Sequence, residues 1–461
     1  MAHPLFGPEV RMMLLDKNAA GLKAFVETLN PNTVAETLSG DTFTVEQVWE
    51  VLGQADARRA AMVFEYMPID WQVTLAQGAG RPQMARLIEL MSHDDRVALL
   101  RRLPAQVSGD LLRLVDEADR RDIANLFRYA ENTVGAIMTT DYAWLPADLT
   151  TGQAIERLRA QAPDRETIYY VYVLDEASRR MLGILSLRAL VLSSPTTPIR
   201  DVMLVNDIVS LRASEDREKA AEALTKYGLI AIPVLDDDGR LVGIVTHDDI
   251  VDVINQEATE DIQRQAGVGP IREGYLEAPL LTLWYSRGKW LALLFVMQML
   301  TINAMRHYED QLKILLILSA FVPVCLSVGG NAGSQAAALV TRGLALGQVT
   351  LGDGLRVFRR ELLIGLALGV MIGVLGLART WLFTSSADPD LGSASLAHLS
   401  YTIALSVAVI CLTGTLLGSL LPLAVAKVGG DPAIASVPFI ATLSDVLGII
   451  IYFNIAAQIV L

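Results

Sequence analysis

Thiol and imidazole side chains are scarce in this sequence. Two cysteines and five histidines are spread over 461 residues, and both cysteines, Cys325 and Cys411, lie in apolar stretches. Their isolation argues against a disulfide framework and against a site that selects soft metals through nitrogen and sulfur ligands. Any metal site is therefore expected to use oxygen ligands.

The patterns of common enzyme sites are also missing. The sequence has no Gly-x-x-x-x-Gly-Lys-Ser/Thr loop, no dinucleotide-binding fingerprint and no Ser-His-Asp order with supporting context. Residues 1–15 hold no uninterrupted apolar run behind a basic start, so we expect no cleaved signal peptide. We expect a protein that is not an enzyme, with its soluble part in the cytosol.

Positive charge is scarce in the first 284 residues. That part has 28 Lys+Arg against 43 Asp+Glu, a net charge of −15, whereas residues 285–461 have 10 against 8, a net charge of +2; together they give the −13 of the chain. An acidic soluble part argues against nucleic acid, whose phosphates require basic patches, and favours cations as ligands.

Long apolar runs are abundant after residue 284. Hydrophobic residues make up 52% of the chain and the mean hydropathy is +0.39, which is too apolar for a fully soluble protein. Five segments reach the ~20 residues that a helix needs to span a lipid bilayer. These expected spans are residues 284–305, 314–339, 362–383, 401–425 and 437–461.

The basic residues of the short loops predict the orientation. If the N-terminal half is cytosolic, the inner loops carry seven Lys or Arg and the outer loops three, as cytoplasmic loops usually do. We therefore expect a cytosolic N-terminal half and an outward C-terminus. The inner residues are Arg287, Lys289, Arg342, Arg356, Arg359, Arg360 and Lys427, and the outer ones are Arg306, Lys313 and Arg379.

One polar stretch continues the second apolar segment. Residues 327–336 read Ser-Val-Gly-Gly-Asn-Ala-Gly-Ser-Gln-Ala. At membrane depth such groups must face other helices or a wet cavity, which favours a pore lining. The alternative is close helix packing through small residues, which leaves Asn331 and Gln335 in need of partners. The expected pore-lining residues here are Ser327, Gly329, Gly330, Asn331 and Gln335.

A lone carboxylate lies deep in the last apolar segment. Asp445 there costs several kcal/mol unless it meets a cation or is protonated, so a functional role is favoured over a structural hydrogen bond. We expect Asp445 to bind a cation in a pore that Thr442 also lines. Two copies of Asp445 across a dimer axis would match one divalent charge, and the odd number of spans fits a homodimer with a shared pore.

An acidic stretch, residues 248–262, precedes the first span. At ~100° per residue, Asp249, Asp252 and Glu260 fall on one helical face, and Glu257 and Asp261 widen it. Like charges so placed repel and would gain from divalent cations. An exposed acidic linker is the alternative; the position next to the first span favours a cation sensor.

The cation is expected to be hard. Oxygen-only ligation suits Mg²⁺ or Ca²⁺, and Mg²⁺ gives up its water reluctantly, so carboxylates, amides and carbonyls could hold the hydrated ion. Oxygen ligands alone do not separate Mg²⁺ from Mn²⁺.

The soluble half has two parts. Up to about residue 130, apolar residues recur every three or four positions and similar turns repeat, which predicts a solenoid of stacked helices. Its acidic residues, such as Asp94 and Asp95, are most simply a solvated face. From residue 134 two similar units follow, each with a Met-ended segment, a helix, a β-rich run, a Gly-containing strand and another helix.

The duplication over residues 134–254 resembles a pair of CBS domains, an α/β module that senses ligands or ions. Adenosine-binding members of that family carry Ser/Thr-x-x-Asp after a unit's last strand. Thr246-His247-Asp248-Asp249 matches this motif, whereas Ser186-Leu187-Arg188-Ala189 lacks the acid. The resemblance thus implies that Thr246 and Asp249 could contact the ribose of ATP, and that the first unit has lost this ability.

The order of parts, with Gly329-Gly330-Asn331-Ala332-Gly333-Ser334-Gln335 and residues 431–448, closely resembles the MgtE family of magnesium channels. The resemblance implies a homodimeric Mg²⁺ channel of a bacterial inner membrane, with Asp445 in the pore. It implies that cytosolic Mg²⁺ stabilises the closed state at Asp249, Asp252, Glu257, Glu260 and Asp261, with Asp94 and Asp95 as further candidates. The expected domains are a helical N-domain (1–131), two CBS units (132–200 and 201–254), a connecting helix (255–283) and an all-α membrane domain (284–461).

Two other functions stay open at this stage. A carrier could couple Mg²⁺ or Mn²⁺ movement to Na⁺ or H⁺, with Asp445 as the carboxylate that is protonated in the cycle. A membrane-tethered adenylate or metal sensor without transport would use the CBS pair alone.

Overall fold

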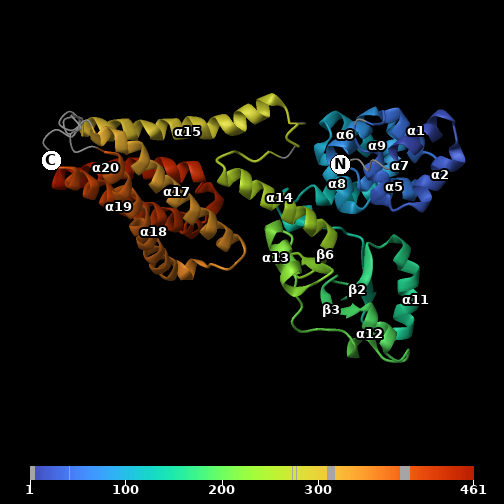
Figure 1. Cartoon of the computed structure of the whole chain (residues 1–461). Helices are drawn as coiled ribbons and strands as arrows, with labels where there is room; N and C mark the ends of the chain where they lie inside the picture. The colour runs from blue at the N-terminus through green and yellow to red at the C-terminus, as the bar shows by residue number, and fades with distance from the viewer. Residues whose placement is uncertain are drawn as a thin grey trace. The chain divides into compact units, whose positions relative to one another are not determined.

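The computed structural model describes residues 6–40, 42–271, 274–276, 278–308, 317–384 and 395–460, and Lys313 and residues 314–316 and 461 of the expected spans lie outside them. The chain divides into two compact units, Met1–Asn255 and Gln256–Leu461. Figure 1 shows helices at the start of the first unit, strands in its second part and long helices in the second unit.

The first unit starts with short helices that form a solenoid. Helices two places apart in the chain pack on each other, α3 on α5, α5 on α7, α7 on α9, and α4 on α6, α6 on α8, α8 on α10. The bounds are α1 Gly7–Leu15, α2 Ala19–Thr28, α3 Pro31–Leu38, α4 Val45–Leu52, α5 Ala57–Glu65, α6 Ile69–Gly78, α7 Arg81–Leu90, α8 His93–Arg102, α9 Ala105–Leu114 and α10 Glu117–Leu126.

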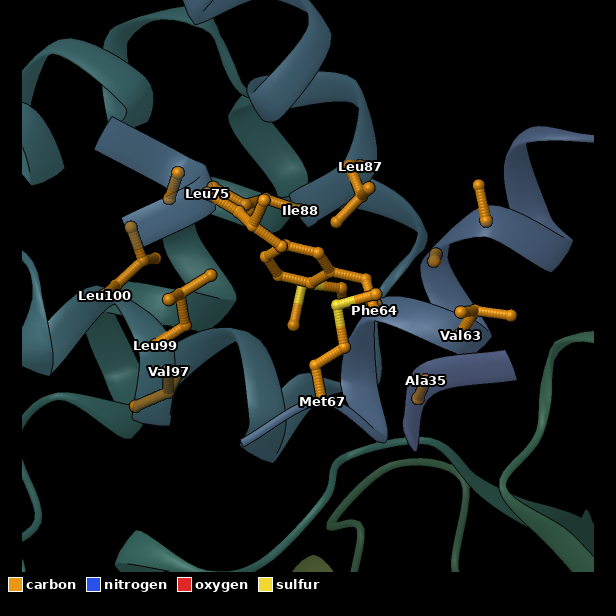
Figure 2. Close-up of a cluster of buried hydrophobic side chains, with 14 of the residues drawn as sticks. Ala35, Val63, Phe64, Met67, Leu75, Leu87, Ile88, Val97, Leu99 and Leu100 are labelled. Atoms are coloured by element: carbon orange, nitrogen blue, oxygen red, sulfur yellow. The ribbon is translucent and has the colours of Figure 1, made fainter. Parts of the chain in front are cut away.

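A 12-residue period sets the solenoid. From Thr44 to Asp116 the residue before each helix recurs at this spacing, and it is always a capping or turn-forming residue. Inside, Phe64 is fully buried and points among Leu75, Leu87 and Ile88 (Figure 2). The predicted helical solenoid is confirmed, with a repeat that is one helix long.

Two sheets of the same topology follow. In each, the first strand pairs parallel with the second and the second antiparallel with the third, giving the orders β1-β2-β3 and β4-β5-β6. The strands are β1 Tyr142–Pro146, β2 Thr167–Leu174, β3 Met181–Ser186, β4 Leu211–Arg212, β5 Ala231–Leu235 and β6 Leu241–Thr246. The helices are η1 Val134–Ala136, α11 Thr151–Gln161, η2 Ala162–Asp164, α12 Leu187–Leu192, η3 Ile199–Asp201 and α13 Arg217–Tyr227. The duplicated α/β module is confirmed.

One helix, α14 (His247–Gln265), starts directly after β6. It ends where Gly267 adopts a left-handed φ of +70° and its N–H bonds the carbonyl of Arg264. The observed helix therefore differs from the connecting helix expected over residues 255–283. The observed helix begins earlier, at His247, and residues 266–271 follow it without helical structure.

Five of the described helices are long and apolar enough to cross a membrane, as expected. Helix α17 packs on α19 and α20, α18 packs on α19, and α15 packs on α20. The bounds are α15 Leu280–His307, α17 Ile317–Ala345, α18 Gly354–Phe383, α19 Leu396–Lys427 and α20 Val437–Ile459, with η4 Leu351–Asp353 before α18 and η6 Pro432–Ile434 before α20. Helices α15, α18 and α19 extend beyond their apolar runs, and α17 continues to Ala345, because residues at their ends also fold as helix; α20 starts with its run at Val437 and ends at Ile459.

Candidate cation-binding sites

Helix α17 has two unlike faces at the Gly-Gly-Asn stretch. Gly329 and Gly333 are buried against Gly414 and Gly418 of α19, so closely that a methyl group on Gly418 would overlap the carbonyl oxygen of Gly333. A methyl group on Gly330 would lie 3.4 Å from Ala441 of α20. Close packing, the alternative interpretation of this stretch, thus accounts for the glycines.

The opposite face of α17 is polar and exposed. Ser327, Asn331 and Gln335, spaced four residues apart, are all exposed, and the Asn331 Nδ2 donates to Ser327 Oγ at 3.2 Å. Because the glycine face holds α19 and α20, these side chains point away from both helices. Hydrocarbon cannot satisfy such groups, so this face requires water or another protein surface.

Asp445 lies on α20, half-buried, one residue after Ser444, whose side chain meets Gly329. Gln298 of α15 hydrogen-bonds the Asp445 carboxylate. Neighbouring Thr442 is buried, and its hydroxyl donates to the Pro438 carbonyl at 2.9 Å, so α20 itself occupies that donor. Gln298 had no signal in the sequence, where it is one amide within an apolar run.

A cluster of carboxylates joins four segments of the first unit. Asp94 and Asp95 start α8, and they meet Asp249 of α14, with Glu65 and Glu166 close by. The carboxyl groups of Asp94 and Asp249 lie next to each other, so the pair is destabilised when both are ionised and gains from holding a proton. The simplest interpretation of the sequence, in which Asp94 and Asp95 lie on a solvated face, is therefore wrong. The family resemblance had included both residues among the candidates for binding regulatory Mg²⁺.

Burial and mutual repulsion disturb this cluster. They raise the pKa of Asp94 well above its usual range, and burial foremost raises the pKa of Asp95 and Asp249 to about 6. Burial likewise raises the pKa of Glu166 to about 7 and that of Glu65 to about 8. Such a set of destabilised carboxylates gains from any cation that can neutralise it.

Hydrogen bonds hold the cluster in place. Glu65 accepts from the Ser92 N–H at 2.6 Å, Ser92 Oγ donates to Asp95 at 3.0 Å, and Thr246 Oγ1 donates to Asp249 at 2.6 Å. Asp94 Oδ1 is buried without a hydrogen-bond partner. Asp252 is also near enough to Asp95 to act on it, and burial and Asp248 raise its pKa.

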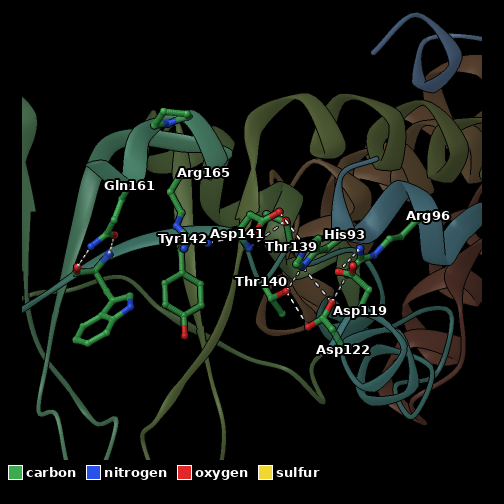
Figure 3. A network of polar contacts seen from close by, with 12 residues as sticks. His93, Arg96, Asp119, Asp122, Thr139, Thr140, Asp141, Tyr142, Gln161 and Arg165 are labelled. Atoms are coloured by element: carbon green, nitrogen blue, oxygen red, sulfur yellow. Dashed lines mark hydrogen bonds and ion pairs between the residues drawn. The ribbon is translucent and has the colours of Figure 1, made fainter. Parts of the chain in front are cut away.

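A network of ion pairs fastens α8 to α10 and to the start of β1 (Figure 3). His93 places Nδ1 3.0 Å from Asp122 and Nε2 3.1 Å from Asp141, just before β1. Arg96, fully buried, donates to Asp119 at 3.0 Å and Asp122 at 2.8 Å. This network, which the sequence did not reveal, positions Asp94 and Asp95 against the CBS pair.

At the C-terminal end of the acidic stretch, arginine side chains lie near the carboxylates. Glu260 pairs with Arg264, which also pairs with Asp431 in the connection from α19 to α20. Burial and Glu257 raise the pKa of Asp261, and Arg342 of α17 opposes them. The expected common face of Asp249, Asp252 and Glu260 thus meets different surroundings at its two ends.

The structure places the expected nucleotide residues within the acid cluster. The Thr246 hydroxyl donates a hydrogen bond to Asp249, whose carboxyl group lies next to that of Asp94. In the first of the two CBS units, Ser186 Oγ accepts a hydrogen bond from the Ala189 N–H at 3.1 Å and so caps α12. Among all described residues, no three His, Cys, Asp or Glu side chains are arranged to hold one metal ion directly.

Together, the solenoid, the duplicated α/β module and the apolar helices define a multi-pass membrane protein with a large soluble half. Family models match all three parts: the MgtE intracellular N domain over residues 29–132, the CBS domain over 134–195 and 199–256, and MgtE, a divalent cation transporter, over 322–455. The chain is 37% identical over 343 residues to the magnesium transporter MgtE of Thermus thermophilus, covering 74% of this chain and 73% of that protein. This chain belongs to the MgtE family.

Further similar proteins also point to the MgtE family. The magnesium transporter MgtE of Bacillus subtilis is 29% identical over 413 residues, 90% of this chain and 86% of that protein. A crystal structure of the soluble part of a magnesium transporter matches 55% of this chain and 98% of its own, with 28% identity and a TM-score of 0.51. The cytosolic domain of the Mg²⁺ channel MgtE in complex with ATP matches 54% and 99%, with 30% identity and a TM-score of 0.50.

Proposed function

We propose that this protein is a homodimeric channel through which Mg²⁺ enters the cell, and that cytosolic Mg²⁺ closes it. The observation that carries the proposal is the polar, exposed face of Ser327, Asn331 and Gln335 on α17. Helix α17 packs on α20, the helix that holds Asp445. Relatives that match most of this chain are named magnesium transporters, at up to 37% identity in those compared above.

The exposed polar face supports the homodimer. A second copy that turns the same face inward would enclose a water-filled path between the two chains, lined by amide and hydroxyl oxygens. Asp445 of each chain would supply charge, and outer-sphere contacts with amides suit an ion that keeps its water. The membrane potential alone drives entry, with about 4.6 kcal/mol per divalent ion at 100 mV.

The carboxylate cluster supports closure by Mg²⁺. Asp94, Asp95 and Asp249 repel each other without a cation, so Mg²⁺ bound there would hold α8 against α14. Hydrated Mg²⁺ needs fewer direct carboxylate ligands than a bare ion, which fits acids that do not converge on one point. Glu257 and Asp261 extend the acidic face toward the membrane half.

Transport is tested with purified protein in liposomes. Asp445→Asn should abolish Mg²⁺ uptake, measured with an internal fluorescent indicator, while Glu361→Gln, an isosteric change of another acid in a membrane helix, should leave it. A channel gives current beyond carrier turnover without added Na⁺ and at equal pH on both sides, whereas a coupled carrier does not. Unchanged metal uptake in Asp445→Asn would leave only the sensor function.

Gating is tested in the same system. Neutralising Asp249, Asp252 and Glu260 together should keep the current at cytosolic Mg²⁺ concentrations that close the parent. ATP is a second ligand to titrate, because Thr246 and Asp249 retain the motif and a related cytosolic domain was solved with ATP. A triple variant that closes at the parent's Mg²⁺ concentration would refute regulation through this face.

A further inference from the structure

An arginine lies between two carboxylates at the end of α14. Arg264 donates through Nη2 to Glu260, one turn earlier on α14, and through Nη1 to Asp431, 167 positions further along the chain. The exposed fractions of the three side chains are only 32, 26 and 27%. Water therefore screens these pairs less than it screens ion pairs on an open surface. A guanidinium suits this place because its fixed fork of N–H groups serves two carboxylates at once.

Asp431 connects this ion pair to α20, the helix that carries Asp445 and is called the pore helix below. Its Oδ2 faces Arg264, while its Oδ1 accepts the Ala433 N–H at 2.8 Å and so caps η6, the turn before α20. Helix α20 starts at Val437 and carries Asp445 two turns later. A shift of Arg264 would therefore act on the turn from which the pore helix starts.

The chain just after Arg264 packs on the same helix start. Gly267, with its left-handed φ of +70°, lies against Pro438 in the first turn of α20, where an added methyl group would be 3.3 Å from the proline ring. Asp261, on the preceding turn of α14, is within electrostatic range of Arg342 of α17. Ionic and close-packed contacts thus coincide at this end of α14.

We propose that Arg264 is the built-in cation of this contact. Its guanidinium joins Glu260 to Asp431, so the end of α14 stays attached to the start of the pore helix at any Mg²⁺ concentration. Without Arg264 the two carboxylates would face each other, repel, and form an oxygen pair that suits a divalent cation. Direct binding of Mg²⁺ is thereby left to the Asp94–Asp249 end of α14, while Glu260 contributes through its ion pair with Arg264; this inference rests on the proposed gating.

The test counts bound ions and does not depend on gating. Full-length protein is titrated with Mn²⁺, whose free concentration is followed by its paramagnetic signal. Arg264→Gln should bind one more Mn²⁺ per chain than the parent, and the matched variant Arg264→Lys, which keeps the charge, should not. Adding Glu260→Gln to Arg264→Gln should remove the extra ion.

Current recordings supply a second readout. In Arg264→Gln the closing curve should become steeper in Mg²⁺ and move to about three- to tenfold higher concentration, as expected for the loss of a half-buried ion pair. No extra Mn²⁺ in Arg264→Gln, or an extra ion that persists after Glu260→Gln, would overturn the inference. A parent that ignores cytosolic Mg²⁺ would instead refute the proposed gating, and the Mn²⁺ count would still decide the role of Arg264.

Discussion

The carboxyl groups of Asp94 and Asp249, which lie 155 positions apart in the chain, meet as neighbouring buried acids. A pair of this kind holds one proton where two isolated aspartates would hold none at neutral pH. The soluble half therefore stores electrostatic repulsion at the junction of α8 and α14, and either a proton or a cation relieves it.

The first prediction concerns pH. Without divalent cations, the soluble half should lose stability as the pH rises from about 5 to about 8. The pKa values of Asp95 and Asp249 (about 6), Glu166 (about 7) and Glu65 (about 8) exceed the 3.8 and 4.5 of unfolded Asp and Glu. The folded state thus binds more protons in this window. Calorimetry of the full-length protein in EDTA measures the effect, and an unfolding temperature that rises with pH would contradict it.

The second prediction is that Mg²⁺ and protons compete. Mg²⁺ should raise the unfolding temperature of the soluble half more at about pH 8 than at about pH 5, because the cluster is ionised only at the higher pH. Protection of the soluble half from limited proteolysis by millimolar Mg²⁺ should follow the same pH dependence. Equal protection at both pH values would show that the cation binds elsewhere.

The third prediction concerns Asp94 itself. An asparagine side chain cannot ionise, so Asp94→Asn removes the repulsion that arises when both Asp94 and Asp249 are charged; at about pH 8 it should stabilise the Mg²⁺-free protein by on the order of 1 kcal/mol and reduce the stabilisation by Mg²⁺. Asp237→Asn, at a side chain that is 87% exposed, is the control and should change neither. If Asp94→Asn lowers stability in EDTA, repulsion is not the dominant force at this site.

The fourth prediction concerns the buried arginine of α8. Arg96→Ala would remove the arginine that pairs with both Asp119 and Asp122 and should cost about 3–5 kcal/mol of stability, as for other buried pairs that lose one member. Asp122 would keep its contacts with His93 and Thr140. Arg113→Ala removes an ion pair whose arginine is 83% exposed and should cost less than about 1 kcal/mol. Chemical denaturation of both variants beside the parent would show a similar loss if burial of Arg96 were unimportant.

The fifth prediction concerns the glycine contacts of the membrane half. Gly418→Ala would force a methyl group into the Gly333 carbonyl, and overpacking of this kind typically costs about 1–3 kcal/mol or more. Gly288→Ala is the control, because a methyl group added at this helix position would meet no neighbouring side chain or helix of the described residues within 4 Å. It should be neutral, or stabilising through helix propensity. Gel filtration after heating in detergent compares them; survival of Gly418→Ala to the parent's temperature would argue against the close contact of α17 and α19.

The spacing of apolar residues predicted the helices well because the buried face of a helix requires apolar residues at regular intervals. The i, i+3, i+4 spacing placed one helix at Val45–Leu52, where the structure has α4, and similar turns at three places belong to the 12-residue period. The apolar runs likewise predicted the membrane helices. Their ends were missed because Gly354 and its neighbours, though outside the apolar run, continue α18.

The candidate sites were predictable only where one segment holds the residues. Asp445 and the α17 stretch stand out as polar groups in apolar surroundings. Glu65 and Glu166, by contrast, join Asp94 from separate segments, and nothing local distinguishes them from solvated acids. Arg264 was overlooked for the same reason, since its second partner, Asp431, belongs to a distant loop. Pairings between remote segments leave no periodic trace.

Helix α14 has neither glycine nor proline between His247 and Gln265. Asp249 and Arg264 are therefore joined by uninterrupted helix, which spans about 22 Å between them at 1.5 Å per residue. A tilt of about 10° of a helix segment of this length displaces its far end by roughly 4 Å. The helix can thus work as a lever, for which the glycine at position 267 is the nearest pivot.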